Sequence, residues 1–240
     1  MDLQTLVYAG IVLFLAYLVR GIAGFGSGLI AVPLLTLVSP VPVVVPLVVS
    51  LDYIGSTSQG ILHRDDIAWK EQLLLLPFMA VGIGLGLFLL RIIPTAVLGK
   101  VLGGFVITYA LYQLLPLPSL RSSRLFASLC GVLGGFVGTL FGTGGPFYVM
   151  YLRLRDLDKG SFRATFAANF IIDGGIRLTA YAIMGLFSQQ ILIYLFAALP
   201  IMGAGIYLGG RMHTGCAQIT FVRFISLLLL ASGVMLLLKR

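Results

Sequence analysis

Charged residues are scarce in this sequence. Only 10% of its 240 residues are Asp, Glu, Lys or Arg, whereas 59% are hydrophobic, and the mean hydropathy is +1.07. A soluble domain carries about 25% charged residues, so a surface that faces water on all sides is excluded. Apolar runs longer than about 18 residues recur along the whole chain, as they do in membrane-spanning helices. The sequence therefore predicts an all-α, polytopic membrane protein.

The motifs of common enzymes and metal sites are missing as well. The two cysteines, Cys130 and Cys216, form no CxxC pair, and neither has a histidine at metal-ligand spacing. His63 and His213 lie in polar segments without partners, so no metal centre or Ser/His/Asp triad can be assembled. No GxxxxGK[ST] nucleotide-binding loop is present. We expect no catalytic residue, no metal, no cofactor and no enzymatic activity.

Basic residues outnumber acidic ones by 16 to 8, which in a soluble protein would suggest binding to nucleic acid. Here the basic residues fall at the ends of apolar runs and in short loops, where topology signals and contacts with lipid headgroups explain them. We therefore expect the lipid bilayer as a partner and no nucleic acid. At the N-terminus an apolar run precedes the first basic residue, which is the reverse of a cleavable signal peptide and indicates a retained span.

The apolar runs predict about eight spanning helices, four in each half of the chain, and two shorter helical limbs. The first membrane repeat is expected at residues 1–115 and the second at 125–240, with a Pro/Ser/Arg-rich connector at 116–124. An even number of crossings per half would make the repeats parallel. A re-entrant hairpin in each half would change that number and could make the repeats inverted, so the parallel and the inverted arrangement both stay open. The segments 63–71 and 153–163 are predicted to be polar loops.

Further glycine motifs indicate that the second half of the chain is a duplicate of the first. Gly82-x-Gly84 in the first half has a counterpart in Gly203-x-Gly205 in the second, and each lies in the second long span after a glycine cluster. Internal duplication builds many transporter folds, in which the substrate site lies at the interface between the repeats.

Two glycine clusters interrupt the apolar sequence at matched places, RGIAGFGSGLIAVPLL at 20–35 and GTLFGTGGPFYVMYL at 138–152. Glycine costs about 1 kcal/mol relative to alanine inside a helix, so each cluster predicts a broken or re-entrant helix. Within a membrane, such a break is tolerated only where it faces protein or a polar cavity. The free N–H groups at the start of the following helix would attract an anion. The alternative is close helix packing through GxxxG spacings.

The predicted substrate-binding groups at these breaks form two matched sets: Gly24, Gly26, Ser27 and Gly28, and Gly142, Thr143, Gly144 and Gly145. Arg20 is a further candidate to line the first break, although a topology charge at the end of a span explains it more simply.

Three polar residues share one face of the span predicted at 162–186. Asn169, Asp173 and Arg177 follow the spacing i, i+4, i+8, and Asp52 lies in the corresponding span of the first half. A charge at the bilayer centre costs at least about 2.5 kcal/mol, so it is usually paired and functional. In the functional interpretation Arg177 binds an anion, Asn169 orients it, and Asp52 or Asp173 carries a proton. The alternative is a structural Asp173–Arg177 pair, or side chains that reach the headgroups from the end of a span.

At these residues the chain resembles the TauE/SafE family of sulfite exporters. The resemblance rests on GFGSGLIAVP at 24–33, GTGGPFYVMYL at 142–152 and RATFAAN at 163–169, and it covers nearly the whole chain. Ser27 departs from the pattern, because a third consecutive glycine is common there. The resemblance implies a multi-pass protein of a prokaryotic inner (plasma) membrane that moves small organosulfur compounds or sulfur oxyanions.

We therefore expect a secondary transporter, an exporter of a small anion such as sulfite or an organosulfonate, with coupling to protons through the two aspartates. The alternatives are a passive anion channel, a membrane-embedded enzyme and a non-transporting scaffold or assembly protein. Saturable exchange would distinguish a carrier from a channel, and a stoichiometric partner without solute flux would indicate a scaffold. The sequence leaves open a homodimer, the exact substrate, the coupling ion and the direction of transport.

Overall fold

The computed structural model describes residues 3–62, 64–114, 124–155, 157–212 and 218–239. The predicted connector at 116–124 lies outside the described residues except for Arg124, and so do His63, His213 and Cys216. Within the described ranges every regular element is a helix, which confirms the predicted all-α class.

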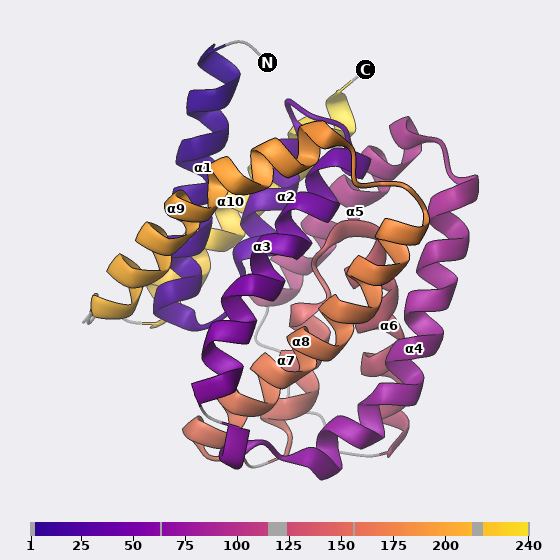
Figure 1. The fold of residues 1–240 in the computed structure, drawn as a ribbon, viewed down its shortest axis with the longest axis vertical. Coiled ribbons are helices and arrows are strands. Elements are labelled where there is room, and N and C mark those ends of the chain that lie inside the picture. The colour runs from indigo at the N-terminus through magenta and orange to yellow at the C-terminus, as the bar shows by residue number, and fades with distance from the viewer. Residues whose placement is uncertain (1–2, 63, 115–123, 156, 213–217, 240) are drawn as a thin grey trace. The chain divides into compact units, whose positions relative to one another are not determined.

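Ten α-helices and one short 3-10 helix follow one another along the described parts of the chain (Figure 1): α1 (Leu3–Ala23), α2 (Ser27–Thr36), α3 (Val41–Leu62), η1 (Arg64–Asp66), α4 (Trp69–Ile92), α5 (Thr95–Leu114), α6 (Arg124–Phe141), α7 (Gly145–Arg153), α8 (Lys159–Ile183), α9 (Gln189–Arg211) and α10 (Gln218–Leu238). The helices α2 and α7 have only 10 and 9 residues, whereas each of the other eight α-helices has at least 18. By length and composition, α1, α4, α5 and α9 are able to cross a membrane. The protein is a polytopic membrane protein.

The helices form two compact units, and each unit draws on both halves of the sequence. The first unit consists of Met1–Val45, Ile93–Pro118 and Gln190–Arg240, and the second of Pro46–Ile92 and Ser119–Gln189. The first unit therefore holds α1, α2, α5, α10 and nearly all of α9. The second holds α4, α6, α7, α8 and most of α3. Each unit contains one of the two short helices.

In each unit the short helix folds back along the long helix before it. In the first unit the Tyr8 hydroxyl, near the start of α1, donates to the Leu34 carbonyl near the end of α2, at 3.1 Å. In the second unit a Cβ at Gly134 of α6 would overlap the ring of Tyr148 of α7. Both predicted breaks are therefore helical hairpins.

The same backbone turn closes both hairpins. Gly24 and Gly142 directly follow α1 and α6, with φ of 83° and 66°. Their N–H groups donate to the carbonyls of Arg20 and Gly138, at 2.7 and 2.8 Å. This is the left-handed glycine cap, which side chains with a Cβ adopt only with strain.

The second glycine of each motif is needed for different reasons. Gly26 caps α2 with φ of 99°, so its backbone conformation excludes other residues. Gly144 caps α7 with φ of −69°, which any residue can adopt. A Cβ at Gly144 would instead overlap the Gly134 carbonyl oxygen of α6. At these equivalent positions, glycine is required by the backbone conformation in the first hairpin and by close packing in the second.

Glycines also bring long helices of different halves into contact. In the second unit, Gly82 and Gly86 of α4 pack against the backbone or side chains of α6, and a Cβ at Gly82 would overlap the Val132 carbonyl oxygen. In the first unit, Gly205 and Gly209 of α9 pack in the same way against α1. Here the GxxxG spacings serve close helix packing, as the alternative interpretation expected.

These contacts correct the predicted register of the repeat by two residues. Gly84 and Gly203 have open space where a Cβ would lie, so the equivalent pairs are Gly82/Gly86 and Gly205/Gly209. In that register LPFMAVGIGLG at 76–86 matches LPIMGAGIYLG at 199–209 in seven of eleven positions. The prolines of this motif both lie inside their helices.

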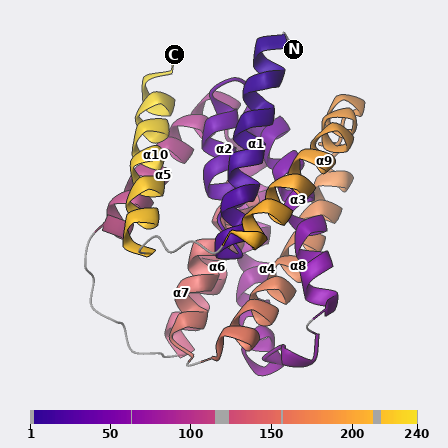
Figure 2. The same cartoon turned by 90° about the vertical axis from the view of Figure 1, so that its left-hand side faces the viewer.

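The last helices of the two halves, α5 and α10, run antiparallel side by side in the first unit (Figure 2). Gly103 of α5 packs against Gly233 of α10, and a Cβ at Gly103 would lie 2.9 Å from the Gly233 carbonyl oxygen. Ten residues further along α5, Gln113 accepts a hydrogen bond at 3.0 Å from Ser226, which lies earlier in α10. Equivalent helices that run in opposite directions are expected of inverted repeats.

Both predicted polar loops are shorter than expected. In the segment 63–71, residues 64–66 form η1 and α4 already begins at Trp69. In the segment 153–163, α8 begins at Lys159, because the Asp158 carboxylate accepts from the N–H groups of Gly160 and Ser161 at 2.8 and 3.2 Å. This N-cap satisfies donors that the first turn of a helix leaves unpaired, and it extends the helix into a charged stretch.

The α4–α6 contact predicts opposite results for neighbouring glycines. Replacing Gly82 by alanine should destabilise the protein by about 1–3 kcal/mol, because the added methyl group forces the two backbones apart. Replacing Gly84 by alanine should raise stability by up to about 1 kcal/mol, since nothing lies within 4 Å of that position and alanine favours the helix. Thermal unfolding of the purified variants in one detergent measures the difference. Equal midpoints for the two variants would contradict the α4–α6 packing described above.

Candidate functional site

The predicted polar face of α8 is completely buried. Asn169 and Asp173 are 0% exposed and Arg177 is 2% exposed. Their spacing places them on successive turns of one face, and this face packs against α4, α6 and α7 within the second unit. The arrangement is therefore internal to that unit.

Arg177 connects α8 to the α6–α7 hairpin. Its guanidinium forms an ion pair with Asp173 one turn earlier, and its Nη1 donates to the Gly138 carbonyl at 2.5 Å. A Cβ at Gly138 would lie 3.2 Å from that Nη1 and 3.4 Å from the Cα of Gly144. Residue 138 therefore has to be small for the guanidinium to reach the break.

A second donor from α8 binds the next carbonyl of α6. The Tyr181 hydroxyl, one turn after Arg177, donates to the Thr139 carbonyl at 2.5 Å. The last four carbonyls of a helix have no partner within the helix, and an unpaired polar group away from water costs about 1–3 kcal/mol. Tyr181 satisfies the Thr139 carbonyl, and Arg177 adds a second donor to the Gly138 carbonyl, which already accepts from the Gly142 N–H.

Two buried polar atoms beside the break keep unused hydrogen-bonding capacity. Among the described residues, the Thr143 hydroxyl and the Asn169 Nδ2 have no hydrogen-bond partner. Asn169 accepts one hydrogen bond through its Oδ1 from the Gln72 side chain of α4, at 3.1 Å. Tyr148 interacts electrostatically with Asp173. Unpaired donors gathered at one buried place can bind a ligand that accepts hydrogen bonds.

The first hairpin carries an arginine as well. The Nη1 of Arg20 donates to the Ser27 hydroxyl oxygen at 3.3 Å, and both residues are buried. Arg20 is therefore part of the packed hairpin, and its role as a topology charge or as a site residue stays a prediction. When Gly24 is aligned with Gly142, Arg20 falls on Gly138, the residue that Arg177 contacts from α8. Each hairpin thus has a guanidinium at the equivalent place, supplied by different helices.

The structure brings together only some of the residues predicted from the sequence. The second break and the three polar residues of α8 belong to the second unit, and so does Asp52 of α3. Asp52 is buried, and the ring of its neighbour Tyr53 covers Gly174 of α8. The first set of glycines and Ser27 belongs to the first unit. The convergence of both breaks on one site stays a prediction.

Three contributors to the site were missed in the sequence. These are Tyr148, Tyr181 and Gln72, and nothing in their spacing distinguishes them from apolar neighbours. Each becomes visible only when α4, α6 and α7 are placed around α8.

The far end of α7 is anchored by Glu71, which the sequence placed in a loop. Its carboxylate accepts from the Tyr151 hydroxyl at 2.5 Å and from Arg155 at 2.6 Å. Because Glu71 lies in the first turn of α4, this contact ties the second hairpin to α4 at the end opposite the glycine break. The anchor limits the movement of α7 relative to α4.

Removing the Tyr181 hydroxyl tests its role at the break. Tyr181→Phe should destabilise the protein by about 1–3 kcal/mol, because the buried Thr139 carbonyl loses its partner from α8. Tyr207→Phe is the matched control, since this tyrosine of α9 is 57% exposed. The thermal midpoints of both variants in detergent measure the effect, and a Tyr181→Phe midpoint equal to that of the control would exclude the proposed role.

Comparison with known sequences covers both hairpins and the buried face of α8. The sequence model of the family described as Sulfite exporter TauE/SafE matches residues 9–236. Searches among curated proteins and among solved structures find no match. Since the family match extends from α1 into α10 and includes nearly all of the chain, the protein belongs to the TauE/SafE sulfite exporter family.

Proposed function

We propose that the protein is a secondary transporter that exports sulfite or an organosulfonate across the inner (cytoplasmic) membrane of a prokaryote. Membership of the family makes it a membrane transporter of small anions. The main support for a sulfur oxyanion or sulfonate as the substrate is the buried guanidinium of Arg177. It lies against a glycine break, in the same unit as donors without partners. A cation inside a membrane protein is usually functional.

The groups around the break suit an oxyanion with several acceptor oxygens. A guanidinium has five N–H donors in a planar fork, which matches the geometry of such anions. The Asn169 Nδ2 and the Thr143 hydroxyl add neutral donors. The N-terminus of α7 has no side-chain cap and carries Pro146 in its first turn, so its positive end remains available to a ligand.

The Asp173–Arg177 pair provides a route to proton coupling. An anion that takes Arg177 as its partner leaves the Asp173 carboxylate buried without its cation, which is strongly unfavourable. A proton bound to Asp173 removes that penalty. Anion and proton would then bind together and leave together, so export would follow the outward gradient of the anion and carry a proton out with it. Asp52, buried in the same unit, is the second candidate for a proton carrier.

The first hairpin is a second candidate for an anion site, and it lies within the first unit. Its support is the matched glycine sequence, the same left-handed turn at Gly24 and Gly142, and the buried Arg20–Ser27 contact. Gly26, Gly28 and the uncapped start of α2 would offer amide donors to an anion there.

Transport by purified protein in liposomes tests this function. Wild-type protein should exchange labelled sulfite or a sulfonate in a saturable manner, and Thr143→Val should weaken the exchange because one donor is lost. Arg177→Gln should lower the rate at least about 30-fold, the effect of removing one member of a buried charged pair. Arg91→Gln, which removes an exposed arginine of α4, should transport normally.

Folding has to be checked beside transport, because Arg177 also binds the end of α6. A monodisperse Arg177→Gln variant that transports like the wild type would exclude Arg177 from the site. Failure of the wild-type protein with a broad panel of sulfur oxyanions and sulfonates would exclude the proposed substrate class.

The coupling step predicts a separate effect of Asp173. Asp173→Asn keeps an oxygen that accepts from Arg177 but cannot exchange a proton, so the variant should exchange anions while a pH gradient no longer drives their accumulation. Asp158→Asn is the control, since asparagine also caps helices well. Accumulation driven by a pH gradient in Asp173→Asn equal to that of the wild type would exclude Asp173 as the proton carrier.

A further inference from the structure

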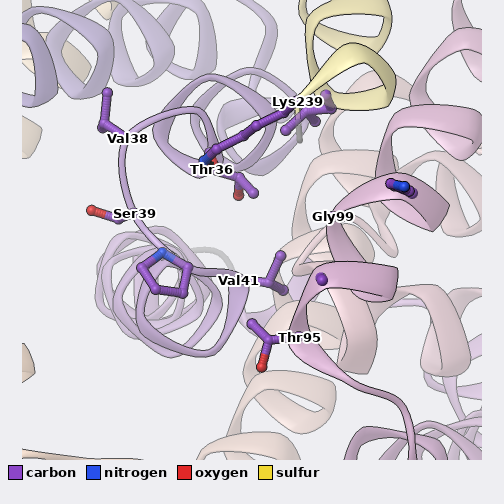
Figure 3. Close-up of a pocket in the computed structure, with 11 residues that line it drawn as sticks. Thr36, Val38, Ser39, Val41, Thr95, Gly99 and Lys239 are labelled. Carbon is purple, nitrogen blue, oxygen red and sulfur yellow. Dashed lines mark hydrogen bonds between the residues drawn. The ribbon is translucent and has the colours of Figure 1, made fainter.

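A separate cavity of about 320 Å³ lies in the first unit, whereas the polar face of α8 belongs to the second (Figure 3). It is formed where the ends of α2 and α10 meet the beginnings of α3 and α5. All of its lining residues belong to the first unit: Thr36, Val38, Ser39, Pro40, Val41, Thr95, Ala96, Gly99, Lys100, Leu236 and Lys239.

The charges of this cavity are all positive. Two of the lining residues, Lys100 and Lys239, are basic and none is acidic. The Lys239 ammonium donates to the Thr36 and Leu37 carbonyls at the end of α2, both at 2.9 Å (Figure 3). It therefore neutralises the negative end of that helix and keeps a third N–H donor. Lys100 lies on α5 and is exposed.

A buried hydroxyl without a partner points into the same space. Thr36 is 4% exposed, its Oγ1 has no hydrogen-bond partner among the described residues, and it lines the cavity. Figure 3 shows this side chain directed toward the space between Val41 and Gly99. An unpaired hydroxyl in a buried position is unfavourable unless a water or a ligand binds it.

Two helices begin at the cavity. The first residues of α3 and α5, Val41 and Thr95, both line it. The first N–H groups of a helix have no partner within the helix, and its dipole makes this end positive. Two lysines, a buried hydroxyl and two positive helix ends therefore surround one space.

We propose that this cavity binds a phosphate-type oxyanion, and that the headgroup of an anionic phospholipid supplies it. Apolar side chains next to the charged ones support the lipid as the source. Val38, in the cavity wall, is 43% exposed, and Val97 and Val101, on either side of Lys100, are 44% and 46% exposed. Leu238, before Lys239, is 74% exposed. An acyl chain can follow these side chains while the headgroup phosphate occupies the cavity.

The test compares lipid and soluble oxyanion on the full-length protein. Purified protein in a zwitterionic detergent receives phosphatidylglycerol, phosphatidylcholine or inorganic phosphate at constant ionic strength, and the thermal midpoint and lipid retention in native mass spectrometry are recorded. Phosphatidylglycerol should raise the midpoint and remain bound, whereas phosphatidylcholine should not. A shift with inorganic phosphate would identify a soluble anion as an occupant of the same site. No response to phosphatidylglycerol or phosphate would overturn the proposal.

Variants locate the binding. Lys100→Gln should weaken the affinity for phosphatidylglycerol about fivefold, as expected for one basic residue near a charged lipid, and Thr36→Val should weaken it as well. Lys70→Gln removes an exposed lysine of the second unit and should bind the lipid like the wild type. Lys239 is left in place, because it also caps α2. If Lys100→Gln and Thr36→Val both bind like Lys70→Gln, the cavity is not the site.

Discussion

The second unit depends on the hydrogen bonds that α8 donates to the broken end of α6. A helix that ends inside a membrane protein exposes carbonyl groups that lipid cannot satisfy. Arg177 and Tyr181 bind two of these carbonyls, at Gly138 and Thr139, and Asp173 holds the charge of Arg177 in a buried position. The glycine break and the polar face of α8 are therefore held together by these hydrogen bonds.

The same arrangement reconciles the two interpretations of the buried charges. A structural Asp173–Arg177 pair is present, and it keeps a guanidinium buried against the Gly138 carbonyl at the glycine break. An anion that binds there exchanges one partner of the guanidinium for another, so the cation need not be stripped of water at that step. Pre-organisation of this kind lowers the cost of binding.

Helical periodicity and glycine content allow much of the helical architecture to be predicted from the sequence. The long apolar runs, the short limbs after each glycine cluster and the shared face of Asn169, Asp173 and Arg177 follow from local geometry that does not depend on the rest of the fold. The register of the second duplicated motif and the starts of α4 and α8 could not be read in this way. The register depends on which glycines touch another helix, and this contact has no local signature. The start of α8 depends on the cap at Asp158, a local contact that lies within a charged stretch.

By itself the sequence determined that the chain is an α-helical membrane protein with two matched breaks and buried charge, because hydropathy and helical spacing are properties of each segment. Only the tertiary structure decided that the breaks are hairpins, that Arg177 meets Gly138 and that Arg20 is buried against Ser27. It also decided that α5 and α10 run antiparallel. Except for Arg20 and Ser27, which are seven residues apart, these contacts join residues far apart in the chain, and long-range packing selects them.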